Sequence, residues 1–153
     1  MTIGVIISTY NNPQWLEKTL WGYTAQTRPA DEIIIADDGS RPETAELIRS
    51  FEKRLPVRHV WHEDNGFRKT IILNKALAMA TADYLVFTDQ DCVPRHDFLA
   101  THERMACSGR FLSGGYFKLT MGISRLPTNE DILSGSAVRL QWLMQPGLML
   151  SFK

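Results

Sequence analysis

The chain has 153 residues, 44% hydrophobic and 22% charged, a composition typical of one soluble domain with its own core. Seventeen Lys and Arg residues balance 17 Asp and Glu residues, which excludes the broad basic surface of a nucleic-acid-binding protein. Two cysteines, Cys92 and Cys107, are too few for a disulfide framework, and no apolar run approaches the roughly 18 residues of a membrane helix. We therefore expect a single domain over residues 1–153, in the cytoplasm.

Strand-like and helix-like segments alternate along the chain. Short β-branched runs indicate buried strands, and segments with apolar residues at helical spacing indicate amphipathic helices. In chain order we predict a strand at 2–8, a helix at 13–26, a strand at 32–36, a helix at 41–55, a strand at 57–61, a helix at 70–80, a strand at 83–88, a helix at 94–107 and a fifth strand at 110–119, which Gly114 and Gly115 interrupt.

This alternation predicts an α/β fold, with a Rossmann-like, mostly parallel sheet flanked by helices. The crossover connections of such a sheet are right-handed. Ligands of such folds bind beyond the carboxyl ends of the strands, near the point where the strand order reverses. The residues that follow each predicted strand are therefore the first place to look for a site.

Polar segments follow all four of the first predicted strands, namely residues 8–12, 37–40, 62–68 and 89–91. Two of them carry pairs of aspartates, Asp37 with Asp38 and Asp89 with Asp91. Carboxylates that gather at one edge of a sheet repel one another unless a cation lies between them. Mg²⁺ or Mn²⁺ takes carboxylate oxygens and keeps positions open for phosphate, so the pattern predicts a metal that holds a phosphorylated ligand.

Plainer interpretations stand beside this one. A D-x-D triplet arises readily by chance, and Asp89 and Asp91 fit a solvated turn that caps the next helix. Residues 37–40, "DDGS", also suit a simple turn, because Asp, Gly and Ser are turn formers. The chain has neither a G-x-G-x-x-G segment after its first strand nor a P-loop, so the two commonest backbone cradles for phosphate are absent.

The segments "VIISTYNNPQWLEKTLWGYTAQT", "EIIIADDGS" and "NGFRKTIILNKALAMATADYLVFTDQDCVPRHDFL" together resemble family-2 glycosyltransferases of the GT-A fold. The resemblance covers about residues 3–99, with the segments in order and at the expected spacing. Its last portion is most similar to bacterial transferases that build surface polysaccharides. It implies a metal-dependent enzyme that moves a sugar from a nucleotide-diphospho-sugar, usually with inversion.

The resemblance implies a nucleobase pocket at the ends of the first two strands. Ser8, Thr9 and Tyr10 would form its wall, with Tyr10 stacked on the base. Asp38 would accept a hydrogen bond from the imide of uracil, and Arg68 would approach the base or the phosphates. The expected donor is therefore a UDP-sugar.

The resemblance also implies a metal site at the end of the fourth strand. Asp91 would bind Mn²⁺ or Mg²⁺ directly, and Asp89 would face the ribose and the metal shell. Gln90, between the two acids, would contact the nucleotide-sugar. The metal would neutralise charge on the leaving diphosphate, and a carboxylate would act as general base on the acceptor hydroxyl.

The general base is the part that the sequence does not assign. Glu130 and Asp131 are weak candidates, since the base of similar proteins lies in an acidic segment well downstream of a glycine-containing strand. Here the gap from Gly114 and Gly115 is short, and Thr128 with Asp131 fits a helix capping box. We interpret the four histidines as ordinary surface or packing residues: His59, His62, His96 and His102.

The family's catalytic domain is longer than this chain, so we expect a truncated domain that keeps the donor-binding part and lacks the acceptor-binding part. The apolar tail, residues 132–153, is a candidate for contact with a partner or with the inner face of a membrane. The acceptor would be a saccharide or a lipid-linked saccharide. One alternative is a catalytically silent module that binds nucleotide-sugar. A second, a sugar nucleotidyltransferase, lacks the glycine-rich basic loop expected after the first strand, because "STYNNPQW" has neither glycine nor a basic residue.

Overall fold

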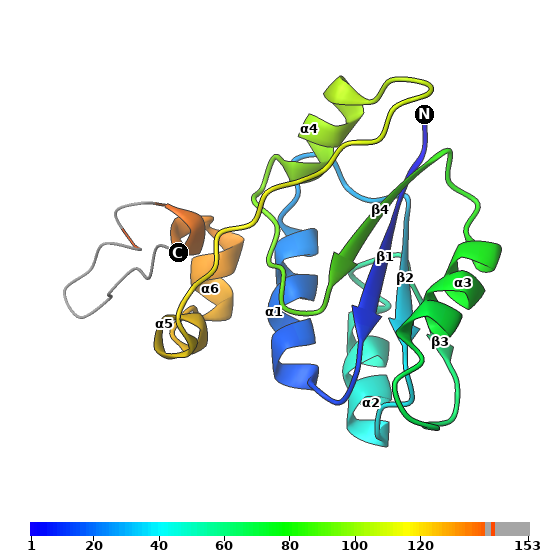
Figure 1. Cartoon of the computed structure of the whole chain (residues 1–153). Helices are drawn as coiled ribbons and strands as arrows, with labels where there is room; N and C mark the ends of the chain where they lie inside the picture. Colours follow the sequence, from blue (N-terminus) through cyan, green and yellow to red (C-terminus); the bar gives the residue numbers. More distant parts are fainter. Residues whose placement is uncertain (140–141, 143–153) are drawn as a thin grey trace.

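The computed structural model describes residues 1–139 and 142 (Figure 1). Its centre is one sheet of four strands in the order β3-β2-β1-β4, and every neighbouring pair is parallel. This confirms the predicted α/β fold with a parallel sheet. The strands are β1 (Ile3–Thr9), β2 (Glu32–Asp37), β3 (Val57–Trp61) and β4 (Tyr84–Asp89).

Helices cover both faces of this sheet. Four of them connect or follow the strands: α1 (Pro13–Thr24), α2 (Pro42–Phe51), α3 (Lys69–Met79) and α4 (Phe98–Met105). Three short elements come later, α5 (Met121–Arg125), α6 (Asn129–Leu133) and the 3₁₀ helix η1 (Ser136–Val138). Figure 1 shows α5 and α6 beside α1, on the side away from the strands.

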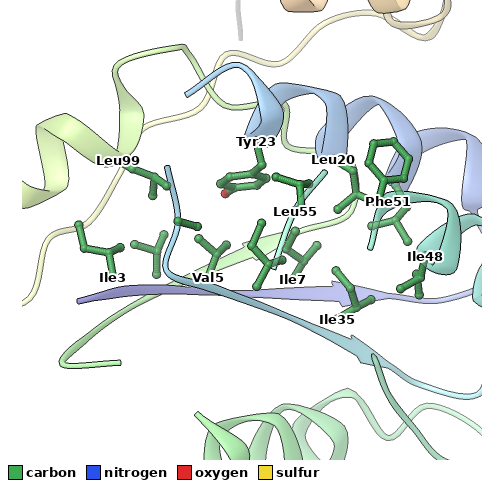
Figure 2. Close-up of a cluster of buried hydrophobic side chains, with 14 residues drawn as sticks. Ile3, Val5, Ile7, Leu20, Tyr23, Ile35, Ile48, Phe51, Leu55 and Leu99 are labelled. Atoms are coloured by element: carbon green, nitrogen blue, oxygen red, sulfur yellow. The ribbon is translucent and has the colours of Figure 1, made fainter. Parts of the chain in front are cut away.

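The two faces of the sheet have separate cores because side chains alternate along each strand. On one face, Ile3, Val5 and Ile7 of β1 pack against α1, α2 and α4 (Figure 2). On the other face, Ile6 of β1 packs with Ile72 and other residues of α3. Both strands β1 and β2 are fully buried, which explains their continuous apolar runs.

The predicted fifth strand at 110–119 is wrong. The chain there forms no strand and no regular helix. A strand is stable only when a neighbour completes its hydrogen-bond ladder, and within the described residues the sheet ends at β4. Gly114 and Gly115 disfavour a strand further, because glycine has no side chain to pack against a neighbouring strand. Both positions face open space, since a Cβ there would have nothing within 4 Å.

The other predicted elements exist, with shifted ends. The largest difference is in the fourth long helix, which begins at Phe98 rather than at residue 94. The loop before it is held from outside, because the carbonyl of His96 accepts from the N–H of Thr27 and the carbonyl of Arg95 accepts from Gln26. These tertiary bonds hold the loop residues before Phe98, so the first turn predicted after Pro94 does not form.

The strand order places the site. β2 and β3 lie on one side of β1 and β4 lies on its other side, so the order reverses between β1 and β4. Residue pairing there brings Ser8 opposite Asp89. Parallel sheets bind ligands at this switch point.

No helix among the described residues is long and apolar enough to cross a membrane. The apolar tail singled out from the sequence lies outside the described residues from Leu140 onward, apart from Trp142.

Candidate functional site

A cavity of about 340 Å³ opens at the carboxyl edge of the sheet. Residues from the ends of β1, β2 and β4 line it together with the start of α3, so it lies at the reversal of strand order. The lining residues are Ser8, Thr9, Tyr10, Ala36, Asp38, Gly66, Phe67, Lys69, Ile72, Asp89, Gln90 and Asp91. The structure thus brings together all the predicted nucleotide-sugar and metal residues except Arg68.

The end of β1 is fastened to the end of β4 through Gln90. The side-chain carbonyl of Gln90 accepts from the Thr9 hydroxyl at 2.5 Å and from the Tyr10 N–H at 3.2 Å. The backbone carbonyl of Gln90 accepts from the Thr19 hydroxyl of α1. Gln90 therefore fixes the backbone that carries the Tyr10 ring.

Asp38 is a buried carboxylate with partners on both oxygens. Its Oδ2 accepts the backbone N–H of Arg68 at 2.9 Å, and its Oδ1 lies 2.6 Å from Nε2 of His62. Its neighbour Asp37 points elsewhere, with Oδ2 2.8 Å from Nε2 of His59 and Oδ1 accepting the N–H of Ser40. Only the second acid of the "DDGS" turn lines the cavity.

Tyr10 is hydrogen-bonded to the loop between β3 and α3. The Tyr10 hydroxyl donates to Oδ2 of Asp64 at 2.8 Å, while about half of the tyrosine is exposed. This hydrogen bond, with a second from the N–H of Gly66, lowers the pKa of Asp64. Phe67 of the same loop is 89% exposed and lines the cavity, so two aromatic rings stand at its mouth.

Asp89 has a cationic partner that the sequence interpretation did not include. The ammonium of Lys69, the first residue of α3, lies 2.5 Å from Oδ1 of Asp89, and the Ser8 hydroxyl donates to the same oxygen. Burial opposes ionisation of this carboxyl, but the bonds from Lys69 and Ser8 outweigh it and lower its pKa. Asp89 is thus an ionised carboxylate with one oxygen engaged.

The acids at the end of β4 fit a divalent cation shared with a ligand. Asp91 is exposed, and its carboxylate contacts only Cys92 Sγ, at 3.8 Å, among the described residues. Within those residues no three His, Cys, Asp or Glu side chains gather into a cage for a metal. Mg²⁺-type ions are commonly held by one or two carboxylates plus substrate phosphates. Asp91 and Oδ2 of Asp89, which accepts no hydrogen bond from the described residues, match that donor set.

Arg68 does not line the cavity. Its guanidinium donates to the carbonyl of Glu63, and its Nε is buried without a hydrogen-bond partner in the described part of the chain. Its backbone N–H, rather than its side chain, reaches Asp38. Lys69, one residue later, is the basic side chain that enters the cavity.

Glu130 and Asp131 lie on α6 and do not line the cavity. Asp131 completes the capping box: the Thr128 hydroxyl oxygen accepts its N–H, and its carboxylate accepts the N–H of Thr128. The hydrogen bonds that its carboxylate accepts from the N–H and the hydroxyl of Thr128 lower the pKa of Asp131. The capping box predicted for Thr128 and Asp131 is therefore confirmed.

Sequence reasoning missed Lys69, Asp64, Phe67 and His62 as members or neighbours of the site. His62, Asp64 and Phe67 lie in the polar segment 62–68 that follows β3, and Lys69 comes directly after it as the first residue of α3. Their position after a predicted strand was the sequence feature that could have identified them as site residues. His62 is buried, as expected of a packing residue, and its partner Asp38 lines the cavity.

Comparison with known proteins agrees with this geometry. The family model described as "Glycosyl transferase family 2" matches residues 4–120. The hyaluronan synthase of Pasteurella multocida is 33% identical over 103 residues, which is 64% of this chain and 11% of the synthase.

Two solved structures share the fold. The mannosyltransferase PcManGT from Pyrobaculum calidifontis, in complex with GDP-Man and Mn²⁺, is 31% identical with a TM-score of 0.59, over 67% of this chain and 31% of that one. S. aureus TarS 1–349 in complex with UDP-GlcNAc is 24% identical with a TM-score of 0.62, and the match covers 77% of this chain and 38% of the TarS chain. The chain thus spans well under half of each of these proteins.

Proposed function

Because the chain belongs to glycosyl transferase family 2, we propose that its cavity binds a nucleotide-diphospho-sugar together with Mn²⁺ or Mg²⁺. The sugar then passes to a saccharide or lipid-linked acceptor in polysaccharide biosynthesis. The observation that carries this proposal is the convergence of an aromatic ring, a buried carboxylate and two exposed carboxylates, from three strands, on one cavity. The hyaluronan synthase likeness supports the polysaccharide assignment.

The base end of the cavity suits a nucleobase with an imide N–H. Tyr10 presents its ring at the mouth, and Asp38 presents a carboxylate with spare lone pairs. Uracil and guanine both carry such an N–H, in keeping with the UDP-GlcNAc and GDP-Man of the two solved structures. We propose UDP as the nucleotide, in agreement with the sequence resemblance.

The phosphate end of the cavity lies at Asp89, Asp91 and Lys69. Asp91 and Oδ2 of Asp89 would hold the divalent cation, which, when bound, neutralises charge on the leaving diphosphate. The Lys69 ammonium adds a fixed positive charge beside Asp89 and can turn to a phosphate oxygen. Without a metal, the carboxylates repel a bare diphosphate.

The described residues that line the cavity include no carboxylate beyond Asp38, Asp89 and Asp91. Each of these has a donor-binding role in this proposal, so the general base is left unassigned. This observation favours one second candidate, a module that binds nucleotide-sugar without transferring it. Release of UDP in the presence of acceptor distinguishes the enzyme from the module.

The test is calorimetric titration of UDP into the chain with and without Mn²⁺. We expect binding with Mn²⁺ and little or none without it. Asp91→Asn should weaken metal-dependent binding at least about tenfold, because it removes a direct metal ligand. Asp97→Asn is the matched control, since Asp97 is ion-paired with Arg95 outside the cavity. A folded chain that ignores UDP under both conditions contradicts the proposal.

A further inference from the structure

A line of three polar side chains runs behind the base end of the cavity. Oδ1 of Asp38 lies 2.6 Å from Nε2 of His62, and Nδ1 of His62 lies 3.4 Å from the ammonium of Lys75 on α3. Asp38 and His62 are both buried, each less than 9% exposed. Among the described residues, Lys75 forms no ion pair with a carboxylate.

For a neutral His62, the donors and acceptors along this line can be ordered in only one way. A lysine ammonium has three N–H donors and no acceptor, so Nδ1 of His62 must present a lone pair to it. A neutral imidazole with a lone pair on Nδ1 carries its proton on Nε2. His62 therefore donates from Nε2 to Asp38, and Asp38 receives a second donor from the N–H of Arg68.

We infer that His62, held in this tautomer by Lys75, is a positioning residue that keeps Asp38 an acceptor and so sets which bases the cavity takes. Both carboxylate oxygens already accept one hydrogen bond, and each keeps a further lone pair for a ligand. A base edge that offers an N–H, as in uracil or guanine, meets an acceptor. Cytosine offers an acceptor at the corresponding ring nitrogen and meets a second acceptor, which is repulsive.

The surroundings of the line make it rigid enough for this role. Gly39, next to Asp38, has a φ of +97°, and a Cβ there would come within 2.6 Å of the Asp64 backbone. The loop that carries His62 is thus packed directly on the turn that carries Asp38. A carboxylate fixed by two donors from this loop, His62 and the N–H of Arg68, does not reorient to suit the wrong base.

This inference rests on the proposed function for its binding consequence, but its first test does not. Long-range ¹⁵N–¹H correlation spectra of the free protein at neutral pH report which imidazole nitrogen carries the proton. We expect the Nε2–H form for His62, with its signals assigned by their loss in His62→Gln. In Lys75→Met we expect Nδ1 to carry a proton in part of the molecules, whereas Lys53→Met, an exposed lysine elsewhere, should leave the spectrum unchanged.

The second test is selectivity, measured as the ratio of UDP to CDP affinity with Mn²⁺ present. His62→Leu should weaken UDP binding about tenfold and narrow this ratio, because a hydrogen bond to a carboxylate is lost. His62→Gln should restore most of the UDP affinity and most of the UDP to CDP ratio, since its side-chain amide can donate to Asp38 in place of Nε2–H. Rescue by Gln would not follow from a merely space-filling role.

The outcomes separate the two proposals. An Nδ1–H form of His62 in the unmodified chain overturns the inference, whatever the chain binds. An unchanged spectrum in Lys75→Met overturns the part assigned to Lys75. Equal UDP to CDP ratios in the unmodified chain and a folded His62→Leu overturn the role in selectivity. If the unmodified chain shows the expected tautomer but binds no nucleotide, the proposed function is contradicted and the tautomer assignment stands.

Discussion

Lys69 changes the electrostatics of the acid pair at the end of β4. Two nearby carboxylates would otherwise repel one another and any diphosphate. The ammonium of Lys69 and the Ser8 hydroxyl both bond Oδ1 of Asp89 and favour its ionised form. Asp91 keeps its carboxylate available beside it. Lys69 thus offsets the charge of Asp89, and in the proposed function Asp91 and Oδ2 of Asp89 would hold the metal.

Replacing Lys69 by Met should raise the pKa of Asp89 towards its ordinary value. The folded pKa is lowered, so the interaction stabilises the fold above the unfolded pKa of about 4 and is lost as the pH falls through the folded pKa. The stability difference between the two proteins should therefore disappear in acid. Carboxyl ¹³C titration with EDTA present, together with urea unfolding across that pH range, measures both effects. An unshifted Asp89 titration contradicts the interaction.

At the scale of elements, the turn after β2 and the loop after β3 form one unit. Gly39 allows the close approach, because its backbone is left-handed and a side chain would meet the Asp64 backbone. Asp64 in turn accepts from the Tyr10 hydroxyl of the β1 end. The segments that follow β1, β2 and β3 thus meet at the base end of the cavity.

Gly39→Ala should destabilise the fold more than Gly109→Ala does. Both glycines have positive φ, but a Cβ at Gly109 has nothing within 4 Å. We expect about 1 kcal/mol of destabilisation at Gly109 from backbone strain, and roughly 1–3 kcal/mol more at Gly39 from the clash. Urea unfolding compares the two, and UDP affinity should fall only for Gly39→Ala. Equal losses of stability would rule out the close packing.

At the scale of the molecule, the sheet has a well-buried centre and an open margin. Strands β1 and β2 lie between two cores, whereas β4 is the last strand of the described sheet and its Phe87 is about half exposed. The segment at 108–119 forms no ladder with it. Protection of the backbone should therefore fall from the centre of the sheet outward.

Hydrogen exchange followed by mass spectrometry checks this gradient. Peptides from β1 and β2 should exchange at least about a hundredfold more slowly than peptides from residues 108–119, because their opening requires disruption of the cores. Addition of UDP and Mn²⁺ should slow exchange in the segments around Tyr10, His62 to Lys69 and Asp89. Slow exchange at 108–119 in the free chain would mean that this segment pairs in solution.

The sequence by itself determined the alternation of strands and helices and the polar residues that follow each strand. Strands of a parallel sheet carry continuous apolar runs, so their ends are visible where Ser8, Asp37 or Thr88 breaks the run. The resemblance then named Tyr10, Asp38, Asp89 and Asp91, and the structure brings them to one cavity. The capping role of Asp131 was likewise visible, because a capping box is local.

Only the tertiary structure decided which side chains pair across the site. Lys69 reaches Asp89 over 20 positions, and His62 reaches Asp38 over 24. Such pairs depend on strand order and on the direction of each side chain, which no local pattern encodes. The failed strand at 110–119 has the same cause, since a strand exists only where a neighbouring edge accepts its hydrogen bonds.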